Sequence, residues 1–207
     1  MAIILGLDIA TVTGFAWYDD KASLSSIKTG LLKAEGDNAE EKAASLARLL
    51  IDELHEWRDE KVDGVLTKRR VRKPLDFVAI EQPMRNIKSF RKTKTDLAGE
   101  VGEATINPNA LQLEGLVCAA VAIVAAFRLP WATIPSATWR KSFFGAGFKP
   151  PLKQVGREVK KDWKGAAVEK CRALRIEVRN ADAAEAVGVA FAGAGLQAFK
   201  MLTRDAA

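Results

Sequence analysis

The sequence has few of the residues that build disulfides or zinc sites. It contains two cysteines and one histidine among 207 residues. Cys118 and Cys171 lie in helix-like stretches without metal-ligand spacing, so we expect reduced thiols and no disulfide. A zinc site would call for more Cys or His ligands than His55 alone can supply. These shortages argue against a disulfide-stapled scaffold and against a zinc enzyme.

Long hydrophobic runs are also scarce. The longest uncharged apolar run, residues 115–127, is shorter than the ~18 residues that a membrane span needs, and we expect a buried helix there. The apolar N-terminal stretch has no basic leader and is interrupted by Asp8, so it predicts a first strand rather than a signal peptide. We therefore expect a soluble, cytoplasmic protein that makes no membrane contact.

The bulk composition indicates one basic domain. The chain is 48% hydrophobic and 28% charged, enough to bury one good core but too short for two large domains, so we predict a single domain over residues 1–207. The net charge is +6 and the pI is about 9.4. This balance favours an acidic partner such as nucleic acid, although ordinary cytosolic proteins can be mildly basic as well.

Residue periodicity predicts an α/β fold. Residues 3–9, 14–18 and 26–32 have the composition of three strands in an antiparallel meander. Residues 38–57 predict an amphipathic helix capped by Asn38, because apolar residues recur there at three- and four-residue spacing: Leu46, Leu49, Leu50, Leu54 and Trp57.

The remaining segments continue the alternation of strands and helices. Residues 59–74 are rich in cations and predict an exposed connection. They are followed by a strand, a helix, a strand and two helices, which we place at residues 75–80, 109–127, 131–134, 165–175 and 181–200. This order predicts a mixed sheet with helices packed on its faces.

Four acidic residues interrupt apolar segments without a neutralising neighbour in sequence. Asp8 lies in Ile3-Ile4-Leu5-Gly6-Leu7-Asp8-Ile9, Glu81 ends a predicted strand, and Asp182 and Glu185 lie in an alanine-rich segment. Burial of unpaired carboxylates is costly, so their presence in such segments suggests a metal site. Each acid taken alone could instead cap a helix or pair with one of the many Lys and Arg residues.

The predicted elements could bring these acids together. A parallel neighbour of the first strand would place Glu81 beside Asp8 past the strand ends. Asp182 and Glu185 are three residues apart, hence on one helix face, and the surrounding alanines would let that helix approach the sheet. Carboxylate oxygens suit Mg²⁺ or Mn²⁺, and two such ions can activate water for phosphodiester hydrolysis.

The sequence resembles the RuvC branch of the RNase H-like superfamily, the Holliday junction resolvases, including those of phages and prophages. The resemblance lies in Leu5-Gly6-Leu7-Asp8-Ile9-Ala10 with Thr13-Gly14, in Ala79-Ile80-Glu81-Gln82-Pro83, and in Asp182-Ala183-Ala184-Glu185-Ala186. It implies an RNase H-like fold with a mixed five-stranded sheet and helices on both faces.

The same resemblance implies a function and a set of site residues. It implies a homodimer that cleaves four-way DNA junctions with two Mg²⁺ or Mn²⁺ ions per site. Asp8, Glu81, Asp182 and Glu185 would be the catalytic metal ligands. The chain departs from the family at the last position, where Asp is usual and Glu185 has a longer side chain, which places its distance to the metal in question.

Cations around aromatic or apolar side chains indicate where DNA would bind. Past Glu81 the chain carries a cation-rich segment whose members could neutralise phosphates or stack on an opened base: Met84, Arg85, Lys88, Phe90, Arg91, Lys92 and Lys94. In the resembling family an aromatic residue near this place probes the junction, and here either Met84 or Phe90 could do so. Lys149 and Lys153 are candidates for stabilising the transition-state phosphate. Residues 68–73 fit a charged surface turn better than a DNA contact.

Several alternatives stay open at this point. The chain could be a nuclease of RNA or of RNA paired to DNA, or a DNA-binding protein without catalysis. Asp8-Ile9-Ala10-Thr11-Val12-Thr13-Gly14 also resembles the phosphate-binding hairpin of sugar-kinase-like ATPases, although those enzymes need two such lobes. The helix predicted over 109–127 is more apolar than one buried face requires, which suits either a dimer interface or a fully buried helix.

Overall fold

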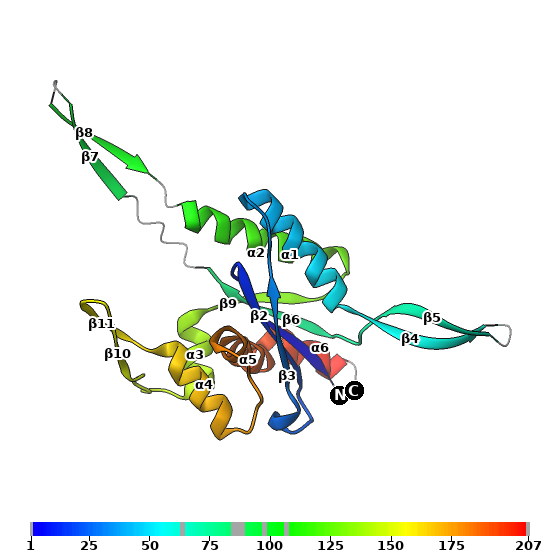
Figure 1. Cartoon of the computed structure of the whole chain (residues 1–207). Helices are drawn as coiled ribbons and strands as arrows, with labels where there is room; N and C mark the ends of the chain where they lie inside the picture. The colour runs from blue at the N-terminus through cyan, green and yellow to red at the C-terminus, as the bar shows by residue number, and fades with distance from the viewer. Residues whose placement is uncertain (1, 63–64, 84–89, 97–98, 106–107, 206–207) are drawn as a thin grey trace.

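A five-stranded mixed sheet forms the centre of the molecule (Figure 1). The computed structural model describes residues 2–62, 65–83, 90–96, 99–105 and 108–205. The strand order is β3-β2-β1-β6-β9, with β1 (Ile3–Asp8), β2 (Val12–Asp19), β3 (Lys28–Lys33), β6 (Phe77–Gln82) and β9 (Trp131–Pro135). The first three strands pair antiparallel, while β6 and β9 run parallel to β1. The predicted meander and mixed sheet are confirmed.

Helices cover both faces of this sheet. One face packs against α1 (Ala39–Glu53) and α2 (Pro108–Ala126). The other packs against α5 (Ala181–Ala194), around which lie α3 (Ser136–Phe144), α4 (Trp163–Ala173) and α6 (Gln197–Asp205). The side chains of β1 alternate between the two cores, with Ile4 in one and Leu5 and Leu7 in the other. A strand buried on both faces has to be apolar throughout, which explains the sequence of β1.

The first long helix is shorter than its apolar pattern predicts. Asn38 is the N-cap, as expected, and its side chain accepts a hydrogen bond from the Glu41 amide at 2.7 Å. The helix ends at Glu53, with Leu54 as its C-cap. Trp57 lies in strand β4 and is 67% exposed, so its predicted place on the buried face of the helix is wrong.

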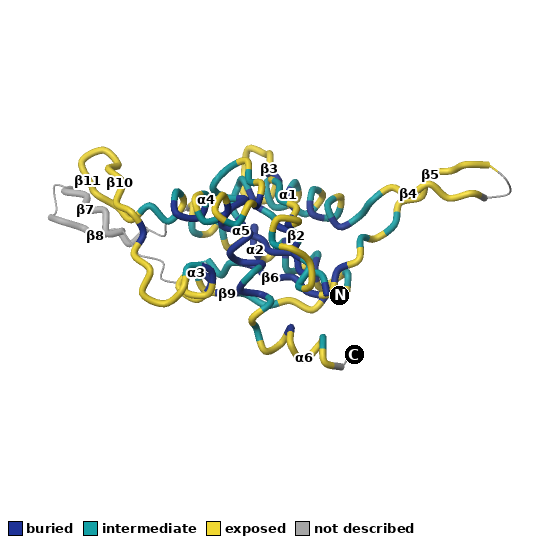
Figure 2. Tube along the Cα trace, turned by 90° about the horizontal axis from the view of Figure 1, so that it is seen from below, coloured by how far each residue is buried: buried dark blue, intermediate teal, exposed yellow. Residues whose placement is uncertain are grey.

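Three hairpins project from this body. They are β4 (His55–Val62) with β5 (Val65–Arg72), β7 (Phe90–Asp96) with β8 (Gly99–Thr105), and β10 (Leu152–Val155) with β11 (Glu158–Lys161). A single 3₁₀ turn, η1 (Leu24–Ser26), precedes β3. Figure 2 shows the β4–β5 and β10–β11 hairpins as exposed arms at opposite ends of the molecule. Of residues 59–74, predicted as an exposed connection, 59–62 belong to strand β4 and 65–72 form strand β5 of this exposed arm.

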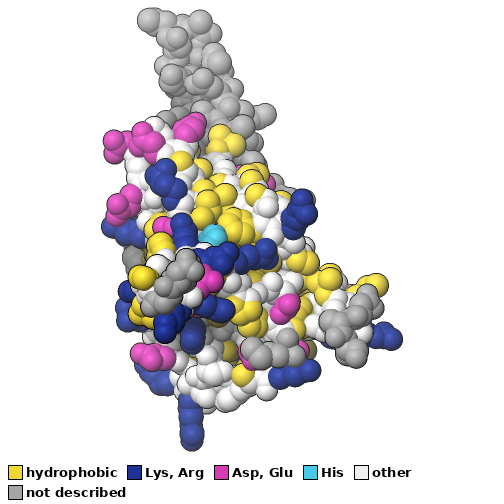
Figure 3. Space-filling view, turned by 90° about the vertical axis from the view of Figure 1, so that its right-hand side faces the viewer, with side chains coloured by type: hydrophobic (Ala, Val, Ile, Leu, Met, Phe, Trp, Pro, Cys, Tyr) yellow, Lys and Arg dark blue, Asp and Glu magenta, His cyan; other side chains and the backbone are white. Residues whose placement is uncertain are grey.

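Cations of residues 68–73 attach the β4–β5 arm to the body. Arg70 Nη2 lies 2.6 Å from Asp52 Oδ1, and Lys73 Nζ lies 2.7 Å from Glu53 Oε1. Arg72 donates to the carbonyl of Phe127 at 2.8 Å and lies over its ring. Figure 3 looks at this side and shows Lys and Arg side chains gathered around the arm. These contacts use part of the charge to hold the arm against the body. Residues 68–72 lie in strand β5 rather than in the predicted surface turn.

The C-terminal helix predicted over 181–200 is two helices. α5 ends at Ala194, and α6 leaves at an angle of 58° to it. The amide of Gly195, the C-cap of α5, donates to the carbonyl of Ala192 at 3.0 Å, which is a short-range bond that closes the helix end. The apolar pattern continues through this break because both helices bury one side on the same core.

Helix α2 is less buried than its sequence suggested. Only 22% of the window Asn109–Ala126 is buried. The buried residues are Leu116, Val117, Ala120 and Val124. By length and composition alone, with a mean hydropathy of 1.7, this window could cross a membrane, and α5 with α6 could do so only as one bent span. Core helices of soluble proteins pass the same test, so this is weak evidence for a span.

Candidate active site

Two acids come together because two parallel strands end side by side. Strands β1 and β6 are paired in register from Ile4↔Phe77 to Leu7↔Ile80. Asp8 and Glu81 are the next residue on each strand, at the carboxyl end of the sheet. This is the edge at which parallel α/β sheets place their ligands. The pairing that the sequence predicted for these two strands is the one observed.

The N-terminal end of α5 brings the other two acids to the same edge. Asn180 caps the helix by accepting from the Ala183 amide at 2.9 Å. The helix lies almost in backbone contact with the sheet, since a Cβ on Gly14 would lie 2.1 Å from the carbonyl oxygen of Asp182. A Cβ on Gly6 would likewise lie 2.5 Å from the helix backbone. Glycine is therefore required at both strand positions for α5 to reach this depth.

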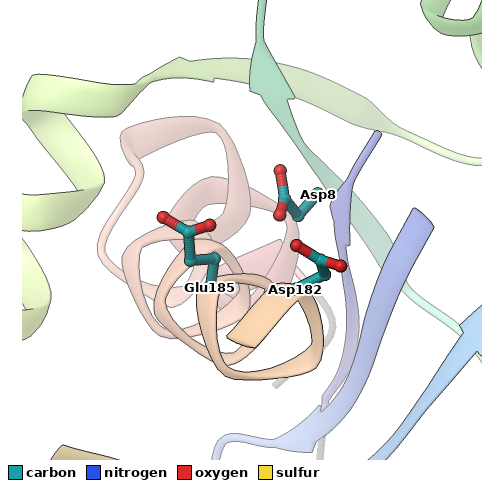
Figure 4. Close-up of side chains that lie close together, drawn as sticks. All are labelled: Asp8, Asp182 and Glu185. Atoms are coloured by element: carbon teal, nitrogen blue, oxygen red, sulfur yellow. The ribbon is translucent and has the colours of Figure 1, made fainter. Parts of the chain in front are cut away.

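Three carboxylates converge at this point. Ligand oxygens of Asp8, Asp182 and Glu185 all lie within 4.8 Å of one another. Figure 4 shows the Asp8 side chain extending from β1 towards the two acids on the first turns of α5. Glu185 is 5% exposed, and its longer side chain does not keep it out of this cluster. Among the described residues, the cluster consists of acids alone, the donor set that hard divalent cations prefer.

Burial and repulsion between the acids raise the pKa values of Asp8 and Glu185 above their ordinary values. Burial raises the pKa of Asp8 to about 9, and the charges of the other acids, led by Glu81, act in the same direction together with a hydrogen bond to Glu81. Burial also raises the pKa of Glu185, although two neighbouring cations oppose the shift. Such a site is short of positive charge, which a divalent ion would supply.

The two cations beside the acids are Lys164 and Arg140, neither of which the sequence had singled out for this site. Lys164 Nζ lies 2.5 Å from Asp182 Oδ1 and 3.9 Å from Glu185 Oε2. Burial lowers the pKa of Lys164, but its hydrogen bond to Asp182 and the surrounding negative charges raise it above its ordinary value overall. Arg140 Nη2 lies 3.6 Å from Glu185 Oε1. No local sequence pattern connects α4 with α5, so only the fold could identify Lys164.

Ser136 orients the fourth acid. Its hydroxyl, at the first position of α3, donates a short hydrogen bond to Glu81 Oε1. Ser136 follows β9, the strand paired with β6, which explains why a residue 55 positions away in sequence reaches Glu81. In the sequence, Pro135-Ser136 directly after the strand is typical of a helix start, but nothing local to it indicates a partner for the Ser136 hydroxyl.

All four acids line one open cavity of about 1850 Å³. The same cavity is lined by Lys153, which the sequence suggested as a phosphate contact, and by Lys164. Lys149, the other suggested lysine, is exposed and lies outside the cavity lining. The cavity is larger than the four carboxylates alone would need, so it leaves room for a ligand beside them.

The cation-rich segment predicted to meet DNA is only partly described. Met84, Arg85 and Lys88 lie outside the described residues. Phe90, Arg91, Lys92 and Lys94 belong to strand β7, whose side chains are likewise outside the description. The choice between Met84 and Phe90 as the junction probe therefore stays a prediction.

The single histidine and the two cysteines lie outside the acidic cluster. His55 begins β4, where its Nδ1 lies 2.6 Å from the carbonyl oxygen of Ile51 and its ring packs edge-on against Phe127. Cys118 is exposed, Cys171 is buried, and both are free thiols. The expected absence of a disulfide is confirmed, and none of these residues belongs to the acidic cluster.

Solved structures share this architecture. No family model and no curated protein matches the chain. The structure of Thermus thermophilus RuvC matches with a TM-score of 0.51 and 14% identity, covering 92% of each chain. T. thermophilus RuvC in complex with a Holliday junction substrate matches with a TM-score of 0.57 and 14% identity, covering 99% of this chain and 97% of that one. The expectation of an α/β RNase H-like fold is confirmed, and the chain has the fold of RuvC.

Proposed function

We propose that this protein is a metal-dependent, structure-selective DNA endonuclease that cleaves four-way junctions. The observation that carries the proposal is the convergence of Asp8, Asp182 and Glu185, with Glu81 beside Asp8, in the lining of one open cavity. The fold adds support, because one of the matching RuvC structures is a complex with a Holliday junction substrate. We further propose that residues 1–207 act as one nuclease domain and, as the sequence suggested, in the cytoplasm.

The donor set fits Mg²⁺ or Mn²⁺. Asp8, Asp182 and Glu185 would hold the ions with Glu81, and two ions would serve both the attacking water and the leaving oxygen of the phosphodiester. The raised pKa of Asp8 supports this assignment, since a site without added positive charge favours the protonated acid. No nucleophilic side chain is required.

The chain's own cations and hydroxyl would complete the site. Lys164 forms an ion pair with Asp182. It would be free to contact a phosphate oxygen once a metal ion bound to Asp182 neutralises that carboxylate instead. Arg140 holds Glu185 from the other side. Ser136 donates to one oxygen of Glu81, and the Glu81 side chain also hydrogen-bonds Asp8. Preorganisation of this kind spares the site from rearranging during the reaction.

We also propose a homodimer, built on the exposed side of α2. Leu111, Gly115, Cys118, Ala122 and Ala125 recur at alternating four- and three-residue spacing along this helix and are all exposed. None of them is charged, and four are small, which would let the α2 helix of a second copy pack closely. Ala122→Glu should then shift the protein from dimer to monomer in sedimentation equilibrium. Glu114→Gln, a neighbouring exposed change, should leave the dimer intact.

The central test compares DNA substrates. In Mg²⁺ or Mn²⁺ the protein should nick synthetic four-way junctions far faster than linear duplex, and Asp8→Asn should bind junctions without cutting them, with a rate loss of at least about 1,000-fold for the loss of a metal ligand. Full activity in Asp8→Asn, or equal cutting of every duplex, would contradict the proposal.

The same assay separates the other hypotheses. Preferential cleavage of an RNA–DNA hybrid or of RNA would replace the junction with that substrate. Metal-dependent release of phosphate from ATP would favour the sugar-kinase-like hypothesis. Tight junction binding without cleavage by the wild-type protein would favour a non-catalytic DNA-binding role. A flap substrate belongs in the panel, because other branched DNA shares the open geometry of a junction.

A further inference from the structure

An aromatic ledge lies at the end of α3. The ring of Phe148 is 41% exposed and stacks on Phe144, with centroids 4.6 Å apart and planes within 11°. Trp163 packs against both rings at 5.7 and 6.1 Å. Between the two phenylalanines, Gly145 (φ 94°) and Gly147 (φ 82°) adopt the left-handed region that favours glycine. These turns return the chain so that Phe148 covers the last residue of the helix.

This ledge, defined as Phe144, Phe148 and Trp163, is directly connected to the acidic cluster. Phe148 and Trp163 line the same cavity as the four acids. The guanidinium of Arg140 lies 4.8 Å over the Trp163 ring and 3.6 Å from a carboxylate oxygen of Glu185. Anything stacked on Phe148 would therefore be held in the cavity in which the candidate metal ligands lie.

Positive charge surrounds the ledge. The cavity wall carries five lysines, three of them on the β10–β11 arm: Lys141, Lys153, Lys160, Lys161 and Lys164. Exposure of aromatic rings to water is energetically unfavourable, so we expect a partner to cover the ledge. An apolar protein surface would leave the surrounding lysines without negative charges to pair with. A nucleotide strand matches both features, because its bases stack on aromatic rings and its phosphates pair with lysine.

We infer that Phe148 is a stacking platform for an unpaired nucleobase next to the scissile phosphate. The inference rests on the proposed function and adds a binding subsite to it. The platform lies on α3 and the loop after it, and so is separate from the segment after Glu81 that was predicted to probe the junction. A base splayed from the junction centre would stack on Phe148, while its phosphates meet the lysines of the β10–β11 arm.

The test is a double-mutant cycle between protein and DNA. In the Asp8→Asn background, Phe148→Ala should weaken binding of a four-way junction by about tenfold, the scale of one lost base stack. Phe148→Trp should retain tight binding. When the crossover nucleotides are made abasic one at a time, one position should remove the effect of Phe148→Ala. Trp57→Ala, which removes a more exposed ring from the distant β4–β5 arm, should leave binding unchanged.

The outcomes distinguish this subsite from the function on which it rests. An effect of Phe148→Ala that is the same at every abasic position, or on continuous duplex, would overturn the platform while leaving a junction nuclease intact. A shift of Phe148→Ala to monomer would assign the ring to a protein contact instead. If the wild-type protein ignores junctions, single-stranded oligonucleotides replace them in the cycle, and loss of Phe148 dependence there would overturn the platform as well.

Discussion

The two faces of the central sheet are packed by different kinds of side chain. On the α1 and α2 face the buried contacts are mostly leucine and valine, among them Leu46, Leu50 and Leu116. On the other face, the buried residues of α5 are alanine, glycine and valine, with Glu185 as the exception. Large side chains keep a helix away from a sheet, whereas small ones allow the backbones to touch. Only the α5 face can therefore hold helix carboxylates against a strand carboxylate.

The comparison predicts that the two faces respond differently to mutation, and the largest effect should come from Gly14→Ala. Its new Cβ would lie 2.1 Å from the Asp182 carbonyl oxygen, so α5 would have to move. A displacement of about 1 Å can cost about 100-fold in rate, and we expect at least that loss of junction cleavage per folded molecule. Single-turnover cleavage, corrected for the folded fraction by circular dichroism, measures it.

Leu46→Ala on the opposite face is the matched control. Leu46 is fully buried, so the change should lower the free energy of unfolding by about 2 to 5 kcal/mol. The cleavage rate per folded molecule should nevertheless stay close to that of the wild type, because none of the four site acids lies on α1. If both substitutions reduced that rate equally, the distinction between the faces would be wrong.

The cations of the α5 face provide a second, smaller test. Lys164→Ala should reduce the maximal cleavage rate by about 10- to 100-fold, on the scale of one lost electrostatic contact in the transition state. The Mg²⁺ concentration for half-maximal rate should fall, because Lys164 no longer competes for Asp182. Lys170→Ala, at the other end of α4, should change neither value. A parallel loss in both variants would assign Lys164 a purely structural role.

A third test uses pH to separate the acidic site from the rest of the fold. Asp8 in the folded protein has its pKa raised from 3.8 to about 9, so the folded state keeps a proton that the unfolded state releases. The stability of the metal-free protein should therefore fall as pH rises from about 4 to about 9. Melting temperatures in EDTA should show this slope, Asp8→Asn should flatten it, and Mg²⁺ should raise stability most at high pH. A wild-type slope unchanged by Asp8→Asn would contradict the assignment.

The smallest effect should come from the β4–β5 arm. Trp57 is 67% exposed and belongs to β4, whose arm lies at the opposite end of the molecule from the β10–β11 arm (Figure 2). Trp57→Ala should change the free energy of unfolding by less than about 0.5 kcal/mol, the usual range for exposed positions. Urea denaturation measures this change. A larger loss would show that the ring has a packing role that its exposure conceals.

The sequence correctly predicted the elements whose signals are local. The strands of the meander and the Asn38 cap follow from periodicity, turn residues and cap chemistry. The pairing of β1 with β6 was also as predicted, although it joins distant segments. The sequence-based prediction was wrong where the same spacing of apolar residues is compatible with two different secondary structures. Trp57 continues a helical spacing, but the cross-strand hydrogen bonds of β4 and β5 satisfy the same backbone groups, and the hairpin forms instead. The break at Gly195 was hidden for a similar reason, since apolar residues continue across it.

By itself, the sequence determined that four acids interrupt apolar segments and that small residues surround two of them. Those two facts predict a helix that approaches the sheet closely and a buried acidic site that is short of positive charge. Only the tertiary structure decided that Lys164, Arg140 and Ser136 attend these acids and that Phe148 lies in their cavity. The physical reason is separation in sequence. Contacts between α3, α4, α5 and β6 depend on how whole elements pack, and that is not encoded in the spacing of neighbouring residues.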